Sequence, residues 1–131
     1  MTPELTALAL AGLLQAATFL PFSVLANMEL GANYTTSPRD KPPDAPLSTL
    51  TGRLQRTMNN TWEALILFTL AVVVVTLGGQ SSGVTAACGW IFLAARLLYI
   101  PAYAFGWRPW RSVIWMVGFT ATMAMILASL I

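Results

Sequence analysis

The residues of this chain that could do chemistry begin with a polar stripe at the start of its second long apolar region. Arg53, Arg56, Asn60 and Glu63 follow one another at intervals of three, four and three residues, and an apolar run starts directly after Glu63. At about 100° per residue, this spacing places all four side chains on one face of a helix. Each unpaired polar group in hydrocarbon costs several kcal/mol, so the stripe needs partners. Those partners indicate what the protein binds.

A second polar group lies in the third apolar region. Arg96 alone among the seven basic residues falls deep inside an apolar stretch, and Tyr99 and Tyr103 follow it on the same helical face. Arg96 and Glu63 each lie nine residues from the same expected end of their helices, or roughly 13 Å along the axis. We therefore expect the buried acid Glu63 and the buried base Arg96 to pair or to share a polar ligand.

A third group, Arg108, Arg111 and Ser112, opens the fourth apolar region. The N-terminus of a helix there adds partial positive charge and free N–H donors. Ser112 has a second interpretation, as the cap of this helix. Together with Arg96 and the other polar residues, the group outlines a mostly cationic cleft. Its ligand would carry carboxylates and amides and would extend into the membrane.

The composition places the chain in a membrane. It has 131 residues, of which 56% are hydrophobic and 9% charged, and its mean hydropathy is +0.67, whereas soluble domains carry roughly a quarter charged residues. With no histidine and one cysteine, the usual zinc sites, a Cys–His nucleophile and an internal disulfide are excluded. The first apolar stretch carries Glu4 and lacks a basic start, so we expect a retained span rather than a removed signal peptide.

The elements that must position these residues are four membrane-spanning helices of about 20 residues each. A proline-containing polar loop follows the first span, and the later connections are short. The fold class is therefore an all-α membrane protein, a single up-down four-helix bundle over residues 1–131. The expected spans cover residues 5–28, 54–78, 84–105 and 110–131.

The distribution of basic residues predicts the orientation. Arg39, Lys41, Arg53 and Arg56 lie in or beside the first loop, while arginines flank the third connection and none lies in the second connection or at either terminus. By the positive-inside rule, the first and third loops face the cytoplasm and both termini face the opposite side. In a bacterium this membrane would be the plasma, or inner, membrane.

The three polar groups together resemble a known family. The pattern Arg53-x-x-Arg56-x-x-x-Asn60-x-x-Glu63, the pattern Arg96-Leu-Leu-Tyr99-x-x-x-Tyr103 and the pair Arg111-Ser112 are similar to motifs of the MAPEG family, membrane-associated proteins in eicosanoid and glutathione metabolism, here of a bacterial type. The resemblance covers essentially the whole chain. It implies a homotrimer of four-helix subunits that binds glutathione, as a thiol co-substrate, between neighbouring subunits near the cytoplasmic side.

The resemblance also implies roles for individual residues. Arg56, Asn60, Glu63, Tyr99 and Tyr103 would hold the tripeptide. Arg53 would support the site at its rim, and Arg111 would activate the thiol, with Ser112 beside it.

Three positions depart from the family pattern. Gly52 stands where many members have an acid, Asn59 replaces a basic residue, and Trp115 takes the place of a tyrosine found in some members. These departures would weaken glutathione affinity. Because of them, the prostaglandin and leukotriene reactions of other family members are not assigned to this chain.

The favoured function is a membrane-embedded glutathione transferase or peroxidase that acts on lipophilic electrophiles, with lipids and no nucleic acid among its partners. A lowering of the thiol pKa from about 8.5 by two units requires roughly 2.7 kcal/mol, which one close arginine at a helix N-terminus can supply. The alternative is a non-catalytic lipid-binding or scaffold protein of the same fold, which the three departures favour. A third reading, a proton-coupled exporter, requires an unpaired, titrating Glu63.

Overall fold

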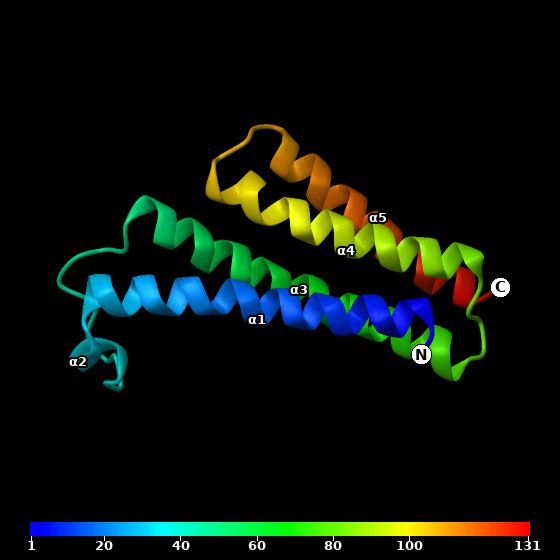
Figure 1. Ribbon diagram of the computed structural model, residues 1–131, viewed down its shortest axis with the longest axis horizontal. Coiled ribbons are helices and arrows are strands. Elements are labelled where there is room, and N and C mark those ends of the chain that lie inside the picture. Colours follow the sequence, from blue (N-terminus) through cyan, green and yellow to red (C-terminus); the bar gives the residue numbers. More distant parts are fainter.

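The computed structural model describes residues 1–131 as a bundle of four long helices and one short helix (Figure 1). The helices are α1 (Pro3–Leu30), α2 (Ala32–Thr35), α3 (Thr49–Leu77), α4 (Gly83–Ala104) and α5 (Trp110–Ser129). The four long helices are long and apolar enough to cross a bilayer. The chain is therefore an integral multi-pass membrane protein, and the predicted all-α four-helix architecture is confirmed.

The third helix, α3, begins earlier than the expected start near residue 54. Its N-cap is Ser48, whose side chain accepts a hydrogen bond from the backbone N–H of Thr51. The carboxylate of Glu29, at the end of α1, accepts hydrogen bonds from the Ser48 N–H at 2.6 Å and the Ser48 hydroxyl at 3.1 Å, and a further one from the Thr51 hydroxyl. A carboxylate at a helix N-terminus also complements the helix dipole. This tertiary contact extends the helix into the stretch expected to be loop.

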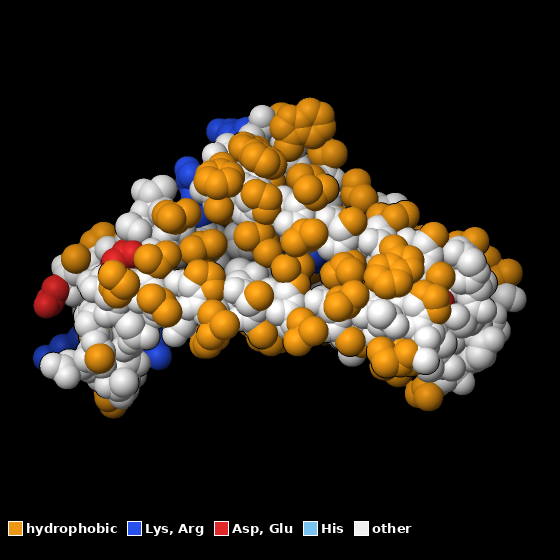
Figure 2. Space-filling model, viewed as in Figure 1, with side chains coloured by type: hydrophobic (Ala, Val, Ile, Leu, Met, Phe, Trp, Pro, Cys, Tyr) orange, Lys and Arg blue, Asp and Glu red, His pale blue; other side chains and the backbone are white.

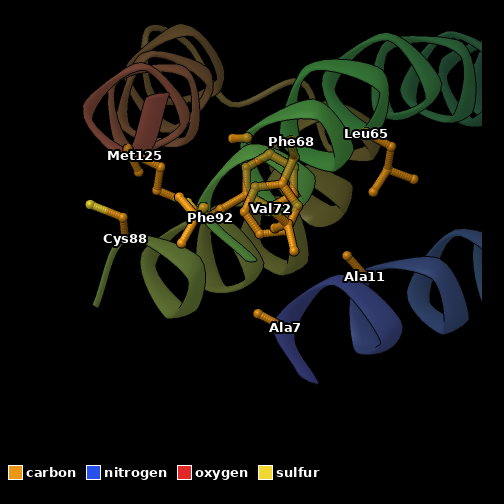
Figure 3. Packing of buried hydrophobic residues seen from close by; sticks show 11 residues of the cluster. Ala7, Ala11, Leu65, Phe68, Val72, Cys88, Phe92 and Met125 are labelled. Carbon is orange, nitrogen blue, oxygen red and sulfur yellow. The ribbon is translucent and has the colours of Figure 1, made fainter. Parts of the chain in front are cut away.

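The packed core lies in the half of the bundle that contains both termini. There the rings of Phe68 in α3 and Phe92 in α4 stack at 3.9 Å between centroids, with Ala7 and Ala11 of α1 facing them and Met125 of α5 beside them (Figure 3). Small residues allow this close approach, as is usual between membrane helices. A Cβ added at Gly89 of α4 would lie 3.5 Å from the Cβ of Ala7.

The two helix pairs, α1 with α3 and α4 with α5, diverge away from this core (Figure 1). The start of α3 and the connection between α4 and α5 lie at the open end, with the loop that contains α2. Six of the seven basic residues belong to this end, which we call the basic end; they are Arg39, Lys41, Arg53, Arg56, Arg108 and Arg111. In the space-filling view, apolar side chains cover much of the visible face, and Lys or Arg atoms lie in the hollow between the two helix pairs (Figure 2).

Candidate functional site

The predicted polar stripe of α3 faces the second half of α4. Arg53 Nη1 donates a hydrogen bond to the backbone oxygen of Ala104 at 3.1 Å, and Arg56 Nε donates to the Tyr103 hydroxyl at 3.0 Å. One turn further along α3, Asn60 Oδ1 accepts a hydrogen bond from Arg96 at 3.0 Å. Because the two helices run antiparallel, successive turns of α3 meet successively earlier turns of α4. The helical spacing in the sequence thus places these side chains on the side of α3 that the structure brings against α4.

Arg96 is the buried base that the sequence indicated, with 2% of its surface exposed. Its Nη2 group donates to Asn60 Oδ1 and, at 2.8 Å, to Thr61 Oγ1, and its Cζ atom lies 4.2 Å from the centroid of the Tyr99 ring. These contacts compensate part of the cost of burying a guanidinium group. The Nε atom is buried without a hydrogen-bond partner. Thr61 was missed by the sequence reasoning, although a hydroxyl next to Asn60 at the edge of the stripe was a usable signal.

The expected direct pair between Glu63 and Arg96 is wrong for a single subunit. The helix register sets Arg96 opposite Asn60 and Thr61, one turn before Glu63, and the Glu63 side chain is exposed. Both residues nevertheless line one small cavity between α3, α4 and α5, of about 150 Å³, which we call the inner cavity. A shared ligand therefore stays a prediction.

The buried acid of the subunit is instead Glu4, with none of its surface exposed. It lies at the opposite end of the bundle from the arginines. Its Oε1 atom accepts hydrogen bonds from the Ser81 hydroxyl at 2.9 Å and from the Thr85 hydroxyl. The carboxylate thus joins the start of α1 to the start of α4 and belongs to the packed half rather than to the site.

Arg111 lies at the start of α5 and reaches toward Tyr103. Its Cζ atom is 4.7 Å from the centroid of the Tyr103 ring, a distance typical of a cation–π contact. Two of the expected free backbone donors are occupied, because the N–H of Arg111 bonds to Trp107 and that of Ser112 bonds to Pro109. The anion-stabilising groups here include the guanidinium group, the helix dipole and the Ser112 hydroxyl.

The interpretation of Ser112 as a helix cap is wrong. The N-cap of α5 is Pro109, and no side chain caps this helix. Ser112 is exposed and lines a cavity of about 500 Å³ that we call the tyrosine cavity. The cavity is bounded by Asn60, Tyr99, Tyr103, Arg111, Ser112, Trp115 and Met116.

A neighbouring cavity of about 480 Å³ opens at the basic end, and we call it the arginine cavity. Its lining consists of Arg53, Arg56, Tyr103, Gly106, Trp107, Arg108 and Arg111. Tyr103 and Arg111 line both this cavity and the tyrosine cavity. Cavities of roughly 300–1,000 Å³ are the usual size for small-molecule sites. The two cavities together bring members of all three polar groups of the sequence to one region, while Glu63 and Arg96 line the inner cavity.

Two of the three departures from the family pattern, Gly52 and Trp115, lie beside residues of this region. A side chain at Gly52 would bring its Cβ within 3.4 Å of Arg56 Nη1, so an acid there would lie beside that guanidinium group. Asn59 is exposed. Trp115 stacks on Phe119 at 5.1 Å between centroids and lines both the inner and the tyrosine cavities. Its indole thus adds apolar surface where a tyrosine would add a hydroxyl.

Comparison with known proteins gives one match. A family model described as the MAPEG family matches residues 7–131, nearly the whole chain. Neither a search of curated proteins nor a search of solved structures gave a match.

Proposed function

The chain belongs to the MAPEG family, and from this premise we propose that it is a membrane-embedded, glutathione-dependent transferase or peroxidase that acts on lipophilic electrophiles. One observation carries the proposal. Arg56, Asn60, Tyr103 and Arg111, from three different helices, converge on the tyrosine and arginine cavities at the basic end. The packing of an apolar bundle does not require such a set of groups, whereas a polar ligand does.

The groups present fit glutathione. Its two carboxylates suit guanidinium partners, its amides suit Asn60 and the tyrosine hydroxyls, and its ammonium group suits the exposed carboxylate of Glu63. The buried Nε of Arg96, which has no partner in the protein, is a further donor beside the inner cavity. Arg53 and Arg108 lie at the rim.

Bound glutathione would supply the thiol that adds to an electrophile or reduces a hydroperoxide. Arg111 would stabilise the anionic form of that thiol, because its guanidinium group lies at the start of α5, where the helix dipole is positive. Tyr103 positions Arg111 from one side through the cation–π contact and is itself held by Arg56. The Ser112 hydroxyl would donate a hydrogen bond beside the thiol.

The lipophilic partner would enter from the bilayer. Trp115 and Phe119 form an apolar wall of the inner cavity, next to the polar groups. A substrate whose apolar part rests on this wall would present its reactive atom toward the tyrosine cavity. The wall also excludes water, which strengthens the electrostatic effect of Arg111.

We further propose that three copies assemble and that the basic end faces the cytoplasm, in the plasma or inner membrane if the source is bacterial. Glu63 supports the assembly, because a carboxylate exposed on a membrane helix is costly unless a neighbouring subunit or a ligand covers it. The concentration of basic residues at one end supports the orientation.

The test is a comparison of Arg111→Ala with Arg108→Ala in detergent-purified protein. Arg111→Ala should keep most of the glutathione affinity measured by calorimetry, because the other groups still hold the tripeptide. It should abolish the ultraviolet thiolate absorbance of the complex and lower turnover about 100-fold, the scale of one preorganised electrostatic contact. Arg108→Ala should be milder, and the opposite ranking would move the catalytic role to Arg108.

The alternative is a lipid-binding or scaffold protein of the same fold, and the departures at Gly52 and Trp115 favour it. It prevails if the wild-type protein binds glutathione but shows neither a thiolate signal nor activity on hydroperoxides and aryl halides. The third hypothesis, a proton-coupled exporter, requires a Glu63 that is not paired with Arg96, and within one subunit the two residues do not bond. The match to the MAPEG family weighs against an exporter.

A further inference from the structure

The arginine cavity contains more positive charge than the proposed thiol site accounts for. Four guanidinium groups line it, from Arg53 and Arg56 of α3, Arg108 of the connection and Arg111 of α5, and no carboxylate is among the lining residues. Like charges gathered around one space repel one another, and water screens them only in part at a membrane surface. An arrangement of this kind favours a bound anion.

Neutral groups hold three of these arginines in place without neutralising them. Arg53 donates to the backbone oxygen of Ala104 and packs flat against Gly106, where a Cβ would lie 3.2 Å from Arg53 Nη2. Gly106 has a φ of 67°, a left-handed conformation that favours glycine and leaves this space open. Arg56 donates to a phenol, and Arg111 rests on the same aromatic ring. The positive charges are therefore positioned but remain uncompensated.

The acidic residues of the helices that adjoin the cavity are engaged or directed elsewhere. Glu29 binds the start of α3 through Ser48 and Thr51, and Glu63 lines the inner cavity. Glutathione in the tyrosine cavity would bring two carboxylates and one ammonium group, and one more negative charge when its thiol ionises. These charges of glutathione leave part of the positive charge of the four arginines without a partner. This comparison of charges rests on the function proposed above.

We propose that the arginine cavity binds the phosphate group of an anionic bilayer phospholipid, beside the thiol site. Guanidinium groups match phosphate oxygens in bidentate geometry. The cavity lies where the helices leave the apolar bundle, next to the exposed Trp107, a residue type enriched at headgroup level. Its volume of about 480 Å³ admits a headgroup. The phosphate sits between Arg53 and Arg108, while Arg111 remains available to the thiol.

The experiment measures lipid retention by native mass spectrometry of the full-length protein in mild detergent. Phosphatidylglycerol should be retained and phosphatidylcholine should not. The double variant Arg53→Gln/Arg108→Gln should weaken phosphatidylglycerol retention roughly tenfold or more. The matched control, Arg39→Gln/Lys41→Gln, removes the same charge from the same end of the bundle but outside the cavity, and it should change retention less than about twofold.

Three outcomes would overturn the proposal. One is an equal loss in both double variants, which shows general surface attraction, and another is equal retention of the two lipids. The third is displacement of the lipid by millimolar inorganic phosphate, together with retention of free phosphate by the wild type. This outcome would mean that the cavity is a site for phosphate and not for a phospholipid. Arg108→Gln alone guards against misfolding, because the exposed Arg108 side chain makes no hydrogen bond within the subunit; it should still weaken retention severalfold.

Glutathione calorimetry on the same samples separates this inference from the proposed function. If glutathione fails to bind while the lipid contrast holds, the thiol chemistry is wrong and the lipid site stands. If glutathione binds and the lipid contrast is absent, the lipid site is wrong.

Discussion

The contact between Arg96 and Thr61 allows a quantitative test of how the buried arginine is held. Arg96 Nη2 donates to Thr61 Oγ1 at 2.8 Å, deep between α3 and α4. The substitution Thr61→Val keeps the shape of the side chain and removes the acceptor. A hydrogen bond from a charged donor contributes about 1.5–3 kcal/mol, and its loss leaves one N–H of Nη2 without a partner, while the bond to Asn60 remains. The expected destabilisation corresponds to roughly a 10- to 150-fold change in the unfolding equilibrium constant.

The same helix supplies a matched control one turn away. Thr57 is also buried, and its hydroxyl donates to the backbone oxygen four residues earlier, as the Thr61 hydroxyl does, but Thr57 has no arginine partner. Thr57→Val should therefore cost less than about 1 kcal/mol, the scale of one neutral hydrogen bond. Equilibrium unfolding in mixed micelles, followed by tryptophan fluorescence, measures both variants.

A double-mutant cycle with Arg96→Leu isolates the contact. In that background Thr61→Val should cost only about as much as Thr57→Val, because each change still removes a hydroxyl bond to the backbone oxygen four residues earlier. The coupling energy should therefore approach the difference between the two single changes. The reasoning fails if the two changes are additive within about 0.5 kcal/mol, or if the control destabilises as much as Thr61→Val.

Three further predictions follow from the packing and the assembly. Glu63→Gln and Arg96→Leu should be additive in stability within about 0.5 kcal/mol, because the two side chains do not bond within a subunit, and a cycle that gives several kcal/mol of coupling would contradict this. Gly89→Leu should cost about 1–3 kcal/mol of stability through overpacking, because a Cβ at this position already lies 3.5 Å from the Cβ of Ala7. Gly12→Leu is the control and should be nearly neutral in the same unfolding assay, because a Cβ there has no atom within 4 Å. Native mass spectra in mild detergent should be dominated by a homotrimer; a dominant monomer or dimer would disprove the assembly.

The sequence predicted which residues share one face of a helix better than it predicted which residues of two helices contact each other. The period of a helix fixes which residues share a face, so Arg53, Arg56 and Asn60 could be assigned to one side of α3 before any partner was known. The relative register of two antiparallel helices is a separate quantity. It is set by close packing in the core, where Phe68 stacks on Phe92. Equal depth of two residues in their own spans therefore did not imply contact.

Two other features depend on contacts between segments far apart in the chain. Glu4 is buried because its hydroxyl partners lie in the connection before α4 and at the start of α4, about 80 residues away, and nothing in its own neighbourhood signals this. The early start of α3 likewise depends on the carboxylate of Glu29. The sequence contains the donors and acceptors, but their pairing arises only when the helices assemble.

The position of the core at one end of the bundle has a consequence for the diversification of this chain. The cluster of 11 buried apolar residues that forms the core lies in the half that contains both termini, away from the basic end. Substitutions around the tyrosine and arginine cavities therefore remove few of the packing contacts that maintain the fold. New substrate preferences can arise there while the opposite half continues to supply the stability. A library confined to residues such as Trp115 and Met116 should yield folded variants at high frequency, with altered activities among them.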